Sequence, residues 1–134
     1  MRSLLISILL LGLSGCAMVD AYFMAGFDSN EYLLVDEIKS VAEVSPTFCE
    51  DRNRMNDIVN NMYLTATKLK NYSAFIPRNE KTIPLTESLY DEVYKLNTRY
   101  QNPDKIGKAY CKMKLNIIEK SAETIQEVVG SKPR

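Results

Sequence analysis

Apolar residues recur every three or four positions along four segments of this chain, and this spacing constrains the fold more than any other feature. Residues so spaced share one face of an α-helix, whereas a strand needs alternation, which we do not find. The stripes are Leu34, Ile38, Val41 and Ala42; Met55, Ile58, Val59, Met62, Ala66 and Leu69; Leu85, Leu89, Val93, Leu96 and Tyr100; and Ile106, Tyr110, Met113, Ile117, Ile118, Ile125 and Val128. We therefore predict an all-α fold, a small antiparallel helical bundle of about four helices.

Capping residues suggest where these helices begin and end. Residues 28–30 (Asp-Ser-Asn) offer N-cap side chains to the first helix. Ser45, followed by Pro46, is suited to cap the second helix, which we expect to end near Asn71. Residues 72–83 lack periodicity and are predicted to be a connection.

The last helix has similar boundary signals. Asn102 and Pro103 are predicted to be its cap and its first helical residue. Gly130 stands where a left-handed C-terminal cap is expected.

The composition fits one globular domain and argues against several classes of function. The chain has 134 residues, 46% of them hydrophobic, and its formal net charge is zero, so it lacks the positive charge of a nucleic-acid-binding domain. It has no histidine, which is the usual general base near neutral pH and the commonest transition-metal ligand. We expect no catalytic residue, metal, cofactor or nucleic-acid partner.

The N-terminus has the parts of a secretory leader. Arg2 supplies a positive charge, and residues 4–13 form an apolar run that is too short to span a bilayer. Two small residues, Ser14 and Gly15, then precede Cys16. This order predicts export from the cytoplasm.

The run Leu13-Ser14-Gly15-Cys16 resembles the lipobox of bacterial lipoproteins. In that family the cysteine thiol receives diacylglycerol, the leader is removed before the cysteine, and the new amino group is usually acylated. The resemblance implies that Cys16 carries two or three acyl chains, such as palmitate, which suffice for stable attachment. Family members kept at the inner membrane commonly have aspartate after the cysteine, so Ala17 implies the periplasmic face of the outer membrane.

The leader and the helical pattern together divide the chain. The expected parts are a lipoprotein signal peptide (1–15), a lipidated N-terminal arm (16–28), a helical bundle domain (29–130) and a C-terminal tail (131–134). Residues 17–27 are mostly apolar, with Asp20 their only charge. They either lie among lipid headgroups or pack on the core of the bundle.

The three cysteines make sense once Cys16 is assigned to lipid. Cys49 and Cys111 remain, and in an oxidising periplasm such a pair predicts a disulfide, with two separate buried thiols as the alternative. We place Cys49 in the first turn of the second helix and Cys111 about two turns into the fourth. Alternate helices of an up-and-down bundle run parallel, so both lie towards one end, at heights differing by roughly 7 Å.

Neighbouring acidic residues are the remaining candidates for acid–base chemistry. Adjacent side chains on a helix point about 100° apart, so they do not converge on one substrate atom. We therefore assign these pairs to solvated helix faces. They are Asp36-Glu37, Glu50-Asp51 and Asp91-Glu92.

Two groups of residues are candidates for partner binding. Tyr90 and Tyr94 are one helical turn apart in a chain with eight tyrosines, and tyrosine suits interfaces, although packing within the domain is the alternative. Phe75 and Ile76 lie in the predicted connection beside Arg78. Two adjacent large apolar residues in a loop either cover the end of the bundle or contact a partner.

These features favour a non-enzymatic interaction protein held in the membrane by the Cys16 anchor. It would act as an adaptor, an assembly accessory or a blocking factor towards another envelope protein. Small lipoproteins of this plan are also encoded by bacteriophages, where they prevent superinfection or help lysis. The alternatives are a carrier of small apolar ligands between the helices and a cell-wall hydrolase that uses carboxylates.

Overall fold

The computed structural model describes residues 23–102 and 104–134. The predicted signal peptide, Cys16, Ala17 and Pro103 lie outside the described residues. The elements are α2 (Ser29–Val44), the 3-10 helix η1 (Ser45–Phe48), α3 (Arg52–Phe75), α4 (Ile83–Gln101) and α5 (Lys108–Gly130).

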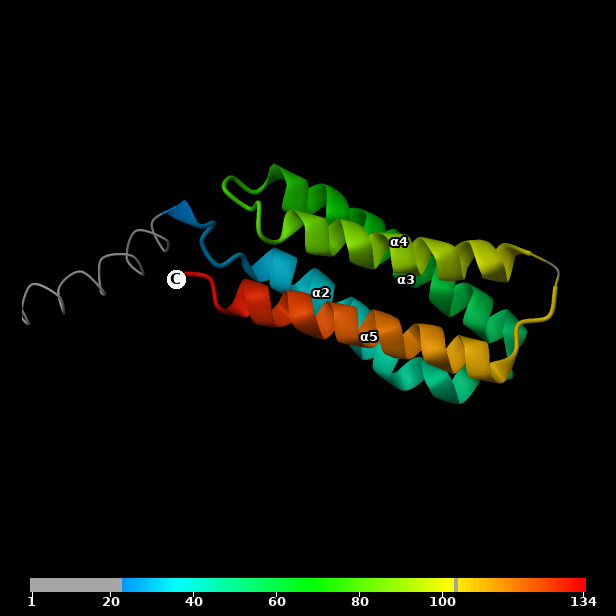
Figure 1. Cartoon of the computed structure of the whole chain (residues 1–134). Coiled ribbons are helices and arrows are strands. Elements are labelled where there is room, and N and C mark those ends of the chain that lie inside the picture. The colour runs from blue at the N-terminus through cyan, green and yellow to red at the C-terminus, as the bar shows by residue number, and fades with distance from the viewer. Residues whose placement is uncertain (1–22, 103) are drawn as a thin grey trace, which may run out of the picture.

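The four α-helices run up and down along a common axis (Figure 1). The most extensive packing is between α3 and α4 and between α2 and α5, and each of these pairs forms one layer. The two layers are joined by the packing of α2 on α3 and of α4 on α5. In the described part of the chain, the backbones of α2 and α4, and those of α3 and α5, do not come close to each other, so these pairs lie on the diagonals. No strand occurs among residues 23–102 and 104–134. The predicted all-α antiparallel bundle is confirmed.

One apolar face of each helix builds the core, although that of α5 differs from the prediction. The buried side chains of α5 are Cys111, Leu115, Ile118, Ala122, Ile125 and Val129. Met113 and Ile117 were expected in the stripe but are 50% and 36% exposed. The apolar residues of α5 cover a wider arc than its two neighbouring helices can bury, so those at the edge remain in solvent.

The predicted cap of the first helix is confirmed, and that of the second is wrong. Asp28 caps α2 by accepting hydrogen bonds from the backbone amides of Asn30 and Glu31, at 2.9 and 3.0 Å. Ser45 continues the helical backbone at φ −72° and ψ −20°, with its hydroxyl donating to the Val41 carbonyl, so it is not the N-cap of α3. The cap of α3 is instead Asp51, which accepts from the amide of Arg54 at 3.0 Å.

Helix α3 also ends later than expected, at Phe75 rather than near Asn71. The extra turn places Ser73 in the interior, where its hydroxyl donates to Glu31 at 2.7 Å. A contact with α2 therefore stabilises a turn that the local sequence does not predict.

The boundaries of α5 are different from the prediction at both ends. The helix begins at Lys108 with Gly107 as its N-cap, not at Pro103. The guanidinium of Arg52 holds the segment before it by donating to the carbonyls of Asn102 and Asp104, the latter at 2.7 Å. Gly130 does not adopt the left-handed conformation, because it is the last helical residue and Ser131 follows at an ordinary φ of −84°.

A disulfide joins Cys49 to Cys111, with their Cα atoms 5.8 Å apart. Cys49 lies between η1 and α3, and Cys111 lies in the first turn of α5. Both positions differ from the prediction by about one turn, yet the expectation that the two cysteines lie at one end holds. Because α3 and α5 are on a diagonal, the disulfide forms through the η1 connection rather than between helix faces. We call this end of the bundle the disulfide end.

At the opposite end a buried ion pair joins Lys132, beyond α5, to Glu31 in the first turn of α2. The Lys132 ammonium lies 2.6 Å from Glu31 Oε2, and the two side chains are 2% and 0% exposed. Asn79 donates to Glu31 Oε1 at 2.7 Å and accepts from Lys132 at 2.6 Å. With Ser73, these residues form what we call the ionic cluster.

The N-terminal arm and the C-terminal residues meet at the same end, as Figure 1 shows. The amide of Ala25 donates to the carbonyl of Arg78 at 2.9 Å, and that of Phe27 to the carbonyl of Pro133 at 2.8 Å. From the buried Ala25 onwards, the arm therefore packs on the domain. We call this end, which contains residues 23–28, 76–82 and 131–134, the arm end.

Reduction of the disulfide is expected to lower the melting temperature. In the chain-entropy model, a closed loop of this length contributes about 4 kcal/mol to the free energy of unfolding. Thermal melts with and without reductant, with mass spectrometry of the Cys49–Cys111 peptide, measure the effect. A Cys49→Ala/Cys111→Ala control should melt identically with and without reductant. An unchanged melting temperature of the wild type would contradict the prediction.

Replacing Lys132 by methionine is expected to lower the free energy of unfolding by about 3–5 kcal/mol, because Glu31 would be left buried without its counter-charge. Urea denaturation measures this loss. The control is Lys112→Met, at an exposed lysine of α5, which should change stability by less than about 0.5 kcal/mol. The Glu31→Gln/Lys132→Met double variant should recover part of the loss, because no unpaired charge remains.

Candidate functional site

The two predicted tyrosines belong to a cluster on the outer surface of α3 and α4. Tyr90 and Tyr94 stack with ring centroids 6.1 Å apart and an interplanar angle of 13°. Tyr63 of α3 packs against both, with centroids at 5.7 and 6.0 Å. We call Tyr63, Tyr90 and Tyr94 the tyrosine face. Tyr100, the last residue of the apolar stripe of α4, is buried in the core and does not belong to this face.

Hydrogen bonding and charge fix the orientation of these rings. The hydroxyls of Tyr63 and Tyr90 share a hydrogen bond of 3.3 Å, and the Lys70 ammonium lies 4.2 Å from the centroid of the Tyr90 ring. The hydrogen bond to Tyr63 raises the pKa of Tyr90, and partial burial raises it further. Tyr94 stays 48% exposed and is the member most open to a partner.

A shallow depression continues this surface from α4 onto the start of α5. It has a volume of about 350 Å³ and opens to solvent. Its lining residues are Tyr94, Lys95, Thr98, Arg99, Asn102 and Tyr110. Tyr94 thus lies at the border between the tyrosine face and a concave surface, an arrangement that can receive a protruding side chain of another protein.

The other three predicted residues lie at the arm end and do not join the tyrosine face. Phe75, at the last position of α3, is 87% exposed, so it does not cover the end of the bundle. Ile76 is half-buried and caps α3. Arg78 adopts a positive φ of 61°, and its carbonyl accepts from Ala25. The five predicted partner-binding residues therefore form two groups.

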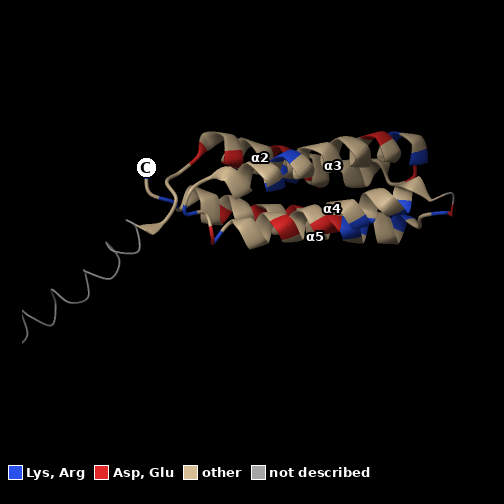
Figure 2. Cartoon of the chain, turned by 90° about the horizontal axis from the view of Figure 1, so that it is seen from above, with Lys and Arg blue, Asp and Glu red and all other residues tan. Residues whose placement is uncertain are grey.

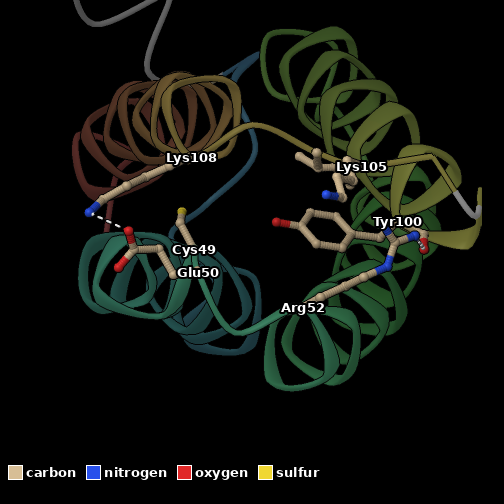
Figure 3. A pocket seen from close by; sticks show the side chains of 7 residues that line it. Cys49, Glu50, Arg52, Tyr100, Lys105 and Lys108 are labelled. Atoms are coloured by element: carbon tan, nitrogen blue, oxygen red, sulfur yellow. Dashed lines mark hydrogen bonds and ion pairs between the residues drawn. The ribbon is translucent and has the colours of Figure 1, made fainter.

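A second pocket of about 350 Å³ lies at the disulfide end (Figure 3). Arg52 on its wall donates to the carbonyls at the end of α4, and Lys108 pairs with Glu50 at 2.9 Å. The Tyr100 hydroxyl points towards the space between the helices and has no protein hydrogen-bond partner, and burial raises its pKa. Since Arg52, Glu50 and Lys108 already have partners, most of this pocket's polar groups serve to close the end of the bundle.

The neighbouring carboxylates have separate partners. Asp36 accepts from Gln126 at 2.8 Å, whereas Glu37 accepts from Thr65 at 3.1 Å. Hydrogen bonding to Lys108 lowers the pKa of Glu50.

Glu92 likewise has its pKa lowered, by hydrogen bonds to Lys114 and Lys95. A general acid would need a raised pKa instead. Among residues 23–102 and 104–134, no cluster of three or more acidic, cysteine or histidine side chains could hold a metal ion.

Sequence reasoning missed two parts of this surface. Lys70 is seven positions after Tyr63, and residues at this spacing lie on one face of a helix. This spacing could have indicated that Lys70 belongs to the same surface. The proximity of Tyr110 to Tyr94 depends on how α4 and α5 pack, and no local signal reports it.

No protein-family model, curated protein or solved structure matches this chain. Its function must therefore be argued from the site itself. No helix within the described ranges is both long and apolar enough to cross a bilayer.

Proposed function

We propose that this chain is a lipid-anchored, non-enzymatic interaction protein of the periplasmic face of the outer membrane, and that its tyrosine face binds another envelope protein. The lipobox-like run ending at Cys16 supports the anchor. The Cys49–Cys111 disulfide supports export, because such bonds persist in oxidising compartments.

The observation that carries the binding role is the ordered, partly exposed tyrosine face. Tyr63 and Tyr90 hold each other in place, and Tyr90 stacks on the exposed Tyr94. Tyrosine provides a large contact area at a small entropic cost, and rings that are already ordered lose little further freedom on binding. This surface is therefore suited to the centre of a protein interface.

The distribution of charge indicates how a partner is recognised. Acidic and basic residues occur on each of the described helices, and in α4 and α5 the basic ones gather towards the disulfide end (Figure 2), but the formal net charge of the chain is zero. Long-range electrostatic steering is therefore weak, and contact area with short-range hydrogen bonds supplies the specificity. Such a surface fits an adaptor, an assembly accessory or a factor that blocks an outer-membrane protein.

Replacing Tyr94 by alanine is expected to weaken partner binding at least about tenfold, as truncation of a central interface tyrosine commonly does, with only a small drop in melting temperature from the lost ring contacts. A photo-crosslinking residue at position 94 in intact cells identifies the partner, and titration of the purified pair measures the affinity. The control is Leu33, which is 61% exposed on α2, and Leu33→Ala should bind normally. Equal crosslinking from positions 33 and 94 would contradict a role for the tyrosine face.

Replacing Cys16 by serine is expected to release the protein from the membrane, because the acyl chains are its main attachment. Fractionation of cells tests this, and a variant still in the membrane pellet would contradict the proposed anchor. In the same assay, Ala17→Asp should move the lipidated protein to the inner membrane. No shift on a density gradient would remove the outer-membrane assignment.

A further inference from the structure

The arm end is the part of the domain that a Cys16 anchor would hold near the membrane. Phe23 is seven positions after Cys16, so the two residues are at most about 25 Å apart even if the chain is fully extended. The bonds from Ala25 to Arg78 and from Phe27 to Pro133 tie the arm to the rest of this end. A Cys16 anchor would therefore keep residues 75–82, at the end of the domain from which the tether leaves, within reach of the bilayer.

The same end presents the most exposed large apolar side chain of the described residues. Phe75 is 87% exposed, and Phe23 in the neighbouring arm is 64% exposed. The other strongly exposed apolar residues, such as Leu33, Leu64 and Met113, lie along the sides of the helices. A phenyl ring held at the tip of the bundle is where an apolar contact with lipid would form.

Basic residues lie in the loop that follows this ring and among the last residues of the chain. The exposed side chains of residues 75–82 and 131–134 include Arg78, Lys81 and Arg134 but only one acid, Glu80. Lysine and arginine can extend to anionic headgroups while their alkyl parts stay on apolar surface. Aromatic and basic residues together are typical of segments at the boundary between headgroups and acyl chains.

The ionic cluster makes this surface rigid. Asn79, in the middle of the loop, is 2% exposed and binds both Glu31 and Lys132. The loop therefore cannot fold Phe75 inwards without breaking buried contacts. Burial of the Glu31–Lys132 pair also keeps those two charges away from the surface.

We propose that Phe75 inserts into the headgroup region of the bilayer that carries the Cys16 anchor, with Arg78 and Lys81 at anionic headgroups. This inference rests on the proposed lipid anchor. The occupant is a phospholipid surface rather than a protein, because the tether length, the exposed ring and the basic residues all coincide at the arm end. The bundle then stands with its arm end on the membrane, and the tyrosine face points sideways.

The absence of tryptophan from the chain permits a direct test. The lipidated Phe75→Trp protein is reconstituted into vesicles of phosphatidylethanolamine and phosphatidylglycerol, with or without bromine on the acyl chains. The matched control is Val44→Trp, because Val44 is 59% exposed at the far end of α2. We expect a blue-shifted emission and about twofold quenching by brominated lipid for Phe75→Trp, and neither for Val44→Trp.

The outcomes separate the inference from the proposed anchor. Vesicle flotation reports the anchor, and a protein that does not float would overturn both proposals. A protein that floats while the indole of Phe75→Trp stays unquenched would overturn the insertion of Phe75 alone. An indole that is shifted only in native outer-membrane fragments, and not in protein-free vesicles, would show that a protein covers Phe75 and would also overturn the inference. Quenching of both variants would mean that the bundle lies flat, against the proposed orientation.

Discussion

The ion pair between Glu31 and Lys132 is the contact on which the arm end depends. It joins the first turn of α2 to the residues after α5, and through Ser73 and Asn79 it includes the end of α3 and the following loop. A buried cluster of this kind is favourable only when it is complete, because removing one charge leaves the other without solvent or partner. The loop, the arm and the C-terminal residues therefore hold one relative position rather than several.

The disulfide end is held by different means. A covalent bond crosses between the η1 connection and α5, and Arg52 closes the end of α4 by binding its carbonyl groups. Neither contact depends on burying a charge pair. The bundle is thus constrained at both ends, which keeps the helices in register and gives the tyrosine face between them a fixed shape.

The proposed functions use this division of the molecule. In these proposals the arm end would hold Phe75 and its basic neighbours at the membrane, whereas Tyr63, Tyr90 and Tyr94 lie on a lateral surface of the bundle. A lateral aromatic surface at a fixed orientation suits a partner that is itself embedded in the same membrane. The arm end would contact the bilayer and the tyrosine face would contact the partner. The anchor raises the effective concentration for both contacts, so each can be weak on its own.

The sequence by itself determined the helices and the disulfide. Helical periodicity depends on residues three and four positions apart, so a short stretch of sequence is enough to predict each of the four helices. The same spacing predicted that Tyr90 and Tyr94 lie next to each other. The cysteine pairing followed from the count and the expected compartment. Tertiary structure alone decided the rest. In the folded chain Asp51, rather than Ser45, caps α3, and Met113 remains exposed. The fold also buries Lys132 against a carboxylate 101 positions away, because burial is set by which distant segments meet and no local pattern encodes that meeting.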